Sequence, residues 1–254
     1  MTTNIQTEAN VPYFGARAAG VILVVVLVSY IFLDVLIVEI LNYLREIDGA
    51  FSLRQSSENK IRALKMVSSG IISPWLMLIM TLAVLKTYFQ KETINAVIKK
   101  FGFAGRPSIK FLAASFVGGI AFVLLFTKIL MHFFPPDQFA APHPANVINY
   151  GPAWGILFFA VTAITIVPVA EEFLFRGVLY QGFSRSWGRL IAAILASLIF
   201  ISIHPDSIES GYWLTHLLLY IIPFLLILVR EITGAIYGSI MIHSGVNFAA
   251  IFLN

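Results

Sequence analysis

Seven long apolar runs follow one another along this chain, and no other feature restricts its fold as strongly. They cover residues 20–41, 67–86, 111–134, 153–175, 190–204, 211–229 and 234–253. About 20 apolar residues suffice for a helix to cross the hydrocarbon core of a bilayer. The chain is 59% hydrophobic and only 12% charged, whereas soluble domains carry about 25% charged residues. The sequence therefore predicts an all-α, polytopic transmembrane helix bundle of about seven spans, within a range of roughly six to eight.

Basic residues concentrate in the connections between these runs. Residues 87–110 place apolar side chains at helical spacing against several lysines, which is typical of an amphipathic helix on a membrane surface. The stretch 42–66 has a similar composition. With a cytoplasmic N-terminus, most Lys and Arg outside 42–66 fall on the cytoplasmic side, as the positive-inside rule requires. We therefore expect an integral protein that contacts anionic lipid, and the sequence contains nothing typical of nucleic-acid binding.

Three groups of polar residues interrupt the C-terminal runs. They are Glu171, Glu172 and Arg176; Phe200 and His204; and His243 and Asn247. An ionisable side chain at membrane depth costs at least a few kcal/mol, so such residues mark a functional site by default. The chain has no cysteine, which excludes thiol nucleophiles, disulfides and cysteine-type zinc sites.

The spacing of the first group separates its two carboxylates. Residues four apart share a helix face, so Glu172 can pair with Arg176, whereas Glu171 points about 100° away from Glu172. One carboxylate can then be neutralised by the arginine, while the other faces a cavity and can act as a general base. A nearby histidine could share a proton with a water, and a His/Asn pair could donate to a developing oxyanion. Together these are the components of a hydrolase for an acyl bond.

The three motifs also occur in a known order. Glu-Glu-x-x-x-Arg, Phe-x-x-x-His and His-x-x-x-Asn lie on separate runs, with RGVLYQGF overlapping the first. This pattern resembles the CPBP family of CAAX-processing endopeptidases and bacteriocin-processing proteins, often called Abi proteins. The similarity covers about 110–254, so we divide the chain into residues 1–110, with N-terminal spans and basic interfacial helices, and a catalytic bundle at 111–254.

The resemblance implies an intramembrane endopeptidase of the glutamate type that needs no cofactor. It implies Glu171, His204, His243 and Asn247 as catalytic residues, and Glu172, Arg176 and Phe200 as supporting residues. Glu171 would activate a water with help from His204, and His243 and Asn247 would line the oxyanion site. The expected substrate is a membrane-associated peptide or protein. Eukaryotic relatives cleave prenylated CAAX peptides, whereas many bacterial relatives resemble peptide-processing or bacteriocin immunity proteins. The short chain lacks an organelle-targeting signal, so we expect the bacterial plasma membrane.

Two alternatives remain open at this point. His204, His243 and Glu171 could instead supply three ligands to a catalytic zinc ion with an open fourth position, although the common His-Glu-x-x-His arrangement is absent. The chain could also be a non-catalytic immunity protein or scaffold, in which Glu172 and Arg176 form an ion pair that only fixes geometry.

Two expectations concern how the helices meet. If 190–204 is a straight helix entering from the cytoplasm, His204 lies about 21 Å along it. His204 can then meet Glu171 if the helix of Glu171 continues to about Phe183, which we favour, or if residues 182–190 themselves lie inside the membrane. Gly234 and Gly238 form a Gly-x-x-x-Gly pattern, which predicts close packing of the last helix and an inward-facing His243.

Overall fold

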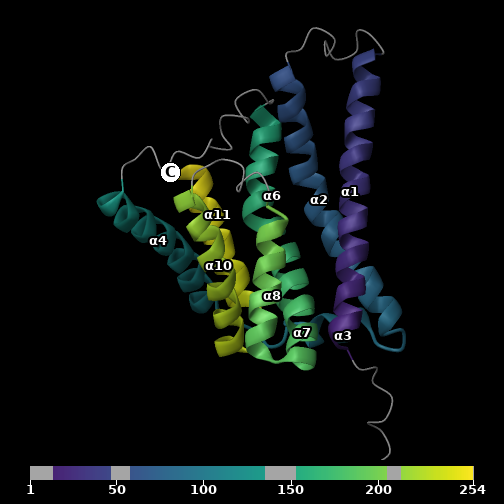
Figure 1. The fold of residues 1–254 in the computed structure, drawn as a ribbon, viewed down its shortest axis with the longest axis vertical. Coiled ribbons are helices and arrows are strands. Elements are labelled where there is room, and N and C mark those ends of the chain that lie inside the picture. Colours follow the sequence, from purple (N-terminus) through teal and green to yellow (C-terminus); the bar gives the residue numbers. More distant parts are fainter. Residues whose placement is uncertain (1–13, 47–57, 135–152, 205–212, 254) are drawn as a thin grey trace, which may run out of the picture.

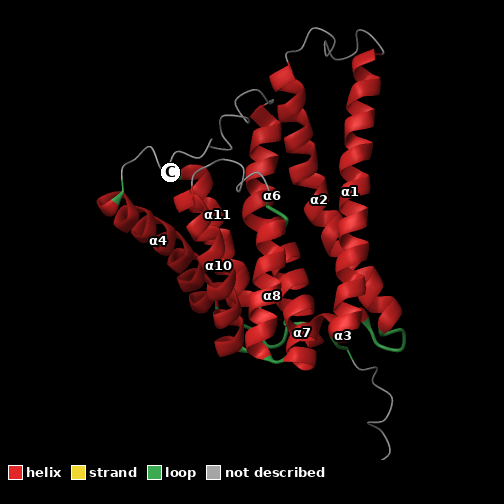
Figure 2. Cartoon of the chain, viewed as in Figure 1, coloured by secondary structure: helices red, strands yellow, loops and turns green. Residues whose placement is uncertain are grey.

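The computed structural model describes residues 14–46, 58–134, 153–204 and 213–253, which are helical apart from short connections and contain no strand (Figure 2). The helices are α1 (Ala16–Glu46), α2 (Glu58–Tyr88), α3 (Ile94–Lys100), α4 (Ile109–Phe133), α6 (Ala153–Glu172), the π-helix η3 (Phe173–Leu179), α7 (Tyr180–Trp187), α8 (Arg189–Ser202), α10 (Trp213–Thr233) and α11 (Tyr237–Phe252). The predicted all-α bundle is confirmed.

Each predicted apolar run lies largely within a helix, but the helices differ in length. Within the described parts of the chain, four segments are long and apolar enough to cross a membrane, at Ala16–Ile40, Gly70–Tyr88, Ile109–Phe133 and Leu157–Trp187. The run at 190–204 forms only the 14-residue helix α8. At 1.5 Å per residue that helix is about 21 Å long, which is shorter than the roughly 30 Å hydrocarbon core.

The helix ends gather at two levels. Figure 1 shows α3 at the lower end of the molecule, where α1, α4, α8 and α11 begin and α2, α7 and α10 end. We call this level the α3 end. Most of the lysines and arginines counted for the cytoplasmic side belong to segments at this end. Arg176 contributes no charge to that surface, because it is only 1% exposed inside the bundle.

The two expected interfacial helices are shorter than predicted. In 87–110 only α3 is helical before α4 begins, and Thr93 caps it by accepting a hydrogen bond from Ala96 N. In 42–66 the described residues continue α1 to Glu46 and begin α2 at Glu58, while 47–57 lies outside the described residues. Basic residues in 58–66 therefore extend a spanning helix, because a helix can continue beyond the bilayer into water.

The N-terminal helices pack against the C-terminal ones. α1 and α2 contact each other, α2 contacts α6, and α1 contacts α7. Gly182 of α7 allows the last of these contacts, because a Cβ there would lie 2.6 Å from the Ala19 Cβ. The α1–α7 contact also includes a hydrogen bond from Ala16 N to Ser186 Oγ, at 2.9 Å. One hydrophobic core thus extends from α1 and α2 to η3 and α7.

The closest backbone approach of the last helix involves other glycines than predicted. A Cβ on Gly245 of α11 would lie 2.1 Å from the Phe116 carbonyl oxygen, and one on Gly119 of α4 would lie 2.2 Å from that of Ile242. Gly238 does pack closely, on Val229 and Phe111, but a Cβ on Gly234 would meet no other group within 4 Å. Gly234 has φ +67° and is part of the turn between α10 and α11. The Gly-x-x-x-Gly interpretation was therefore wrong for Gly234.

Candidate active site

The two glutamates lie where an α-helix changes into a π-helix. α6 ends at Glu172, η3 follows from Phe173 to Leu179, and α7 continues without interruption to Trp187. Every residue of η3 is buried. Insertions of π-helix are rare and often occur at functional sites, because the wider turn re-aims the side chains around it. The helix continues past Phe183, which is the first of the two arrangements expected to bring Glu171 to His204.

Glu172 is the centre of a buried polar network. Its Oε1 accepts a hydrogen bond from Arg176 Nη1 at 2.9 Å and lies 3.0 Å from His243 Nδ1. Arg176 Nη2 donates to the carbonyl oxygen of Pro223 in α10, at 3.3 Å. The predicted Glu172–Arg176 pair is present, and both side chains are almost wholly enclosed, at 0% and 1% exposed. The network joins three helical segments at one carboxylate, so it fixes their relative positions.

Glu171 faces a different set of groups. Its Oε1 lies 4.0 Å from His204 Nε2, and its Oε2 lies 3.7 Å from His243 Nε2. Both separations exceed hydrogen-bond length, and Oε2 is buried without a hydrogen-bond partner. The two carboxylates therefore differ in their charged neighbours, although Glu172 Oε2 is also buried without a hydrogen-bond partner. The cavity expected in front of Glu171 stays a prediction. Glu172 is bound by a cation, while Glu171 opens onto two imidazoles.

The backbone and Glu172 orient the two imidazoles. His204 Nδ1 lies 2.7 Å from the Phe200 carbonyl oxygen, which can only accept, so Nδ1 carries the proton and donates it. His243 Nδ1 likewise donates to Glu172, because a carboxylate is an acceptor. In both rings Nε2 is the nitrogen turned toward Glu171. The hydrogen bond at one nitrogen thus leaves the other available for chemistry.

Phe200 forms an aromatic wall of the site. Its ring centroid lies 4.8 Å from Arg176 Cζ, 4.7 Å from the His204 ring and 6.1 Å from the His243 ring. At these distances the ring attracts the guanidinium through its π-face and keeps water from the ion pair. The supporting position predicted for Phe200 agrees with these contacts.

Asn247 is placed one helical turn beyond His243, but its amide is engaged elsewhere. Its Nδ2 donates to the carbonyl oxygen of Ala163 in α6, at 2.8 Å. This bond ties α11 to α6. The structure thus brings six of the seven predicted residues together around Glu171 and Glu172, and it gives Asn247 an interhelical contact that the motif did not indicate.

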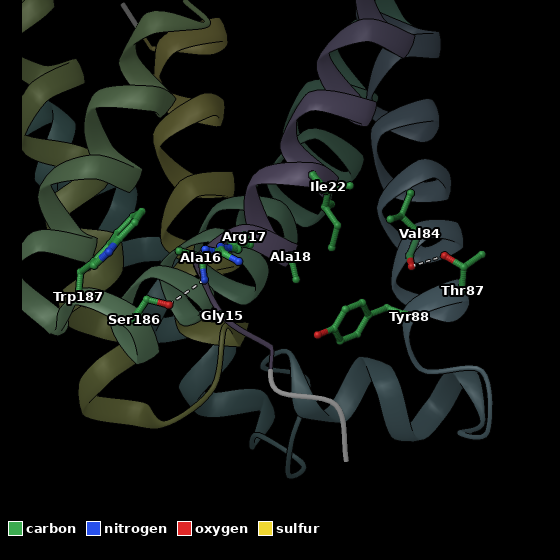
Figure 3. Close-up of a pocket in the computed structure, with 11 residues that line it drawn as sticks. Gly15, Ala16, Arg17, Ala18, Ile22, Val84, Thr87, Tyr88, Ser186 and Trp187 are labelled. Carbon is green, nitrogen blue, oxygen red and sulfur yellow. Dashed lines mark hydrogen bonds between the residues drawn. The ribbon is translucent and has the colours of Figure 1, made fainter. Parts of the chain in front are cut away.

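A cavity near the start of α1 lies away from this site. It has a volume of about 770 Å³ and is lined by the start of α1, the end of α2 and the end of α7, including Arg17, Val84, Tyr88 and Trp187. Figure 3 shows Trp187 and the hydrogen bond between Ala16 and Ser186 on one side, and Val84 and Tyr88 on the other. No glutamate or histidine of the site lines it. This cavity is therefore separate from the candidate active site.

Sequence reasoning missed the backbone groups that complete the network. The carbonyl groups of Pro223 and Ala163 accept from Arg176 and Asn247, and no side-chain pattern indicates a carbonyl acceptor on another helix. The π-turn, which contains Gly177, was also missed. A Cβ on Gly177 would lie 2.5 Å from the Phe101 carbonyl oxygen, so the backbone of another segment packs directly against this turn.

The predicted zinc alternative concerns the same atoms. Within the residues that the structure describes, no group of three or more His, Asp or Glu is arranged as a metal site. Glu171, His204 and His243 nevertheless face one another, so their use as zinc ligands stays a hypothesis that chelation can test.

Comparison with known proteins gives a match over the helices that carry this network. Residues 152–249 match the family model of the type II CAAX prenyl endopeptidase, Rce1-like. No curated protein and no solved structure matches the chain. The matched segment contains α6, η3, α7, α8 and α10 with nearly all of α11, which are the elements that carry the polar network. Residues 152–249 of this membrane protein are therefore similar to the CAAX protease family, also called CPBP.

Proposed function

We propose that this protein is an intramembrane endopeptidase that hydrolyses a peptide bond with a water activated by Glu171. The observation that supports it best is the position of the Glu171 carboxylate, 4.0 Å from His204 Nε2 and 3.7 Å from His243 Nε2. These gaps are too long for direct hydrogen bonds, and a water can bridge polar groups at such separations. Glu171 is only 9% exposed, so the bundle shields this site from the lipid.

The reaction follows from these positions. Glu171 takes a proton from the water while the water oxygen forms a bond to the carbonyl carbon of the substrate. His204, which carries its proton on Nδ1, accepts a hydrogen bond from the water at Nε2 and so orients it. The tetrahedral intermediate collapses when the carbon–nitrogen bond breaks. The protonated Glu171 then gives its proton to the leaving amine nitrogen, which restores the carboxylate.

The other side of the site stabilises negative charge. Glu172 accepts from His243 Nδ1 and so orients the ring. In this scheme a His243 imidazolium donates its Nε2–H to the oxyanion as it develops. Arg176 neutralises Glu172, so the carboxylate can remain buried. In this scheme Asn247 uses its second amide N–H for the oxyanion, because the first is bound to Ala163. Glu172, Arg176 and Phe200 support the site without touching the substrate.

The substrate that fits this setting is a membrane-associated peptide or protein. The site lies within a helical bundle with four segments able to cross a bilayer, so a scissile bond must reach it from within or beside the membrane. The cationic α3 end is the cytoplasmic face by the positive-inside rule, which puts the N-terminus in the cytoplasm. We place the protein in a bacterial plasma membrane.

The decisive experiment compares wild type with Glu171→Gln in detergent, using CAAX-type and membrane-proximal reporter peptides. Gln keeps the size of the side chain but cannot take the proton, so we expect cleavage to fall by about 10²-fold or more. Glu39→Gln is the matched control, since Glu39 is an exposed glutamate of α1. Equal cleavage by wild type and Glu171→Gln would rule out the assigned role of Glu171.

Chelation separates the remaining alternatives. Cleavage that survives excess chelator but not Glu171→Gln supports a glutamate-activated water. Cleavage that is lost on chelation and restored by zinc assigns Glu171, His204 and His243 to a metal, because all three are possible zinc ligands. If the folded wild type cleaves no reporter but binds a peptide that Glu171→Gln also binds, the protein is an immunity protein or scaffold.

A further inference from the structure

The short turn Phe101–Phe103, which we call the 101–103 turn, touches the helix of the glutamates. A Cβ on Gly177 would lie 2.5 Å from the Phe101 carbonyl oxygen, so the turn and η3 are in backbone contact there. The Phe103 ring also lies 5.6 Å from that of Phe173, which directly follows Glu172. The 101–103 turn thus contacts η3 at Phe173 and at Gly177.

The same three residues hold the start of α11. Ile236 N donates to the Gly102 carbonyl oxygen at 3.0 Å, and the Tyr237 hydroxyl donates to that of Phe103 at 3.2 Å. The rings of Phe103 and Tyr237 lie 5.6 Å apart in an edge-to-face arrangement. α11 then runs from Tyr237 to His243, a rise of about 9 Å. A shift of its first residue is therefore transmitted to the imidazole.

The turn itself has a firm support in the N-terminal helices. Phe101 is 1% exposed, and its ring lies 4.7 Å from that of Phe14 and 5.8 Å from that of Phe89. Val97 of α3 is also buried beside it in the same core. The turn is thus fixed to the α1–α2 pair on one side and to η3 and α11 on the other.

We propose that the 101–103 turn is a positioning element of the active site, which sets the distance between the Glu171–Glu172 helix and the His243 helix from outside the family-matched segment. The hydrogen-bond network at Glu172 lies deeper in the bundle and needs this distance to bring His243 Nδ1 within 3.0 Å. The catalytic part of this inference rests on the proposed function. The structural part, that the turn holds η3 and α11 in place, does not.

Two neighbouring glycines allow a matched test. Gly102 has φ +109°, and a Cβ on it would lie 2.7 Å from Ile236 Cγ2, whereas Gly105 has φ +81° and nothing within 4 Å. Alanine strains the backbone at both positions, because left-handed conformations disfavour side chains. Only Gly102→Ala also pushes against α11. Tyr237→Phe provides a milder second variant, because it removes one hydrogen bond and keeps the ring.

The first measurement is amide hydrogen exchange of the full-length protein in lipid nanodiscs. We expect Gly102→Ala and Tyr237→Phe to speed exchange in the peptides of both η3 and α11, with no such change in Gly105→Ala. This readout does not depend on activity. Exchange equal to that of Gly105→Ala in both variants would overturn the proposal.

The second measurement is cleavage of the reporter peptide by the folded fraction. A misplacement of about 1 Å can cost about 10²-fold in rate, so we expect kcat to fall by about that factor in Gly102→Ala with KM nearly unchanged. Faster exchange with unchanged kcat would overturn the catalytic part. Faster exchange in a protein whose wild type cleaves nothing would support the structural part and count against the proposed function.

Discussion

Helix α1 and the continuous helix α6–η3–α7 are both long and apolar, yet the bundle treats them differently. In α1 the buried residues Ala19, Ile22 and Val26 recur at three or four positions and form one face, while residues between them such as Val24 and Val28 are more than half exposed. In the other helix every residue from Ala170 to Phe183 is buried. One face of α1 is thus open to lipid, whereas the middle of the other helix is enclosed by its neighbours. Nearer its start, Leu157, Phe158 and Val161 are more than half exposed.

The difference follows from what each helix carries. The apolar window of α1 has a hydropathy of 3.1, whereas that of Leu157–Trp187 is only 1.8. The second helix carries Glu171, Glu172 and Arg176, whose charges lipid cannot solvate. Such a helix is stable at membrane depth only if protein groups from other helices replace the missing water. Enclosure of an otherwise apolar helix thus indicates a functional site, while exposure indicates a contact with lipid.

The largest expected effect uses the same substitution in both helices. Glu172→Gln removes the charge that balances Arg176, which is 1% exposed, whereas Glu39→Gln changes an exposed side chain of α1. Loss of one partner of a buried pair costs about 3 kcal/mol or more. We expect the unfolding midpoint of Glu172→Gln to fall by roughly 6–12 °C and that of Glu39→Gln to stay near the wild-type value. Thermal unfolding in detergent measures both.

A second substitution shows whether the unbalanced charge is the cause. Replacing Arg176 by Met in the Glu172→Gln background removes the remaining cation, so part of the lost stability should return. The contrary result is a double variant that is less stable than Glu172→Gln by as much as Arg176→Met alone destabilises the wild type. The network would then act through packing, and the enclosure of this helix would not depend on its charges.

A smaller effect is expected where one helix has both kinds of surface. In α4, a Cβ on Gly119 would lie 2.2 Å from the Ile242 carbonyl oxygen, whereas a Cβ on Gly118 would meet no other group within 4 Å. Gly119→Ala must separate α4 from α11, and overpacking of this kind costs about 1–3 kcal/mol. Gly118→Ala should instead stabilise the helix slightly, because alanine favours helix over glycine by up to ~1 kcal/mol. Thermal unfolding of both variants measures the difference. Equal effects would mean that α4 has no distinct lipid and protein sides.

Much of this comparison could be predicted from the sequence. The bilayer leaves helices as the main solution for long apolar runs, so the bundle followed from hydropathy. The Glu172–Arg176 pair followed from i, i+4 spacing, because both residues belong to one helix. The meeting of Glu171 with His204 followed from motif order together with a helix continuing past Phe183. These features depend on local periodicity or on the order of motifs.

What could not be predicted depends on how helices are placed against one another. The bond from Asn247 to Ala163, the contact of Arg176 with Pro223 and the glycine contact of α11 with α4 each join residues far apart in sequence. Periodicity shows which face of a helix is apolar but not which neighbour covers it. The π-turn was missed for the same reason. It lies where Gly177 packs against the Phe101 carbonyl group, and this contact joins residues far apart in sequence.

The smallest expected effect compares two valines of α1, of which Val26 is 2% exposed and Val28 is 60% exposed. Lipid tails are as apolar as a protein core, so burial in protein gains packing contacts rather than escape from water. Val26→Ala leaves unfilled space in a rigid interior and should cost about 1 kcal/mol. Val28→Ala leaves space that lipid fills, so its cost should be under about 0.5 kcal/mol.

Unfolding in nanodiscs rather than in detergent is the proper measurement, because the prediction depends on lipid surrounding Val28. If the two variants lose equal stability, the outer face of α1 is covered by protein, such as a second copy of the chain, and α1 is enclosed in the same way as the helix of the glutamates.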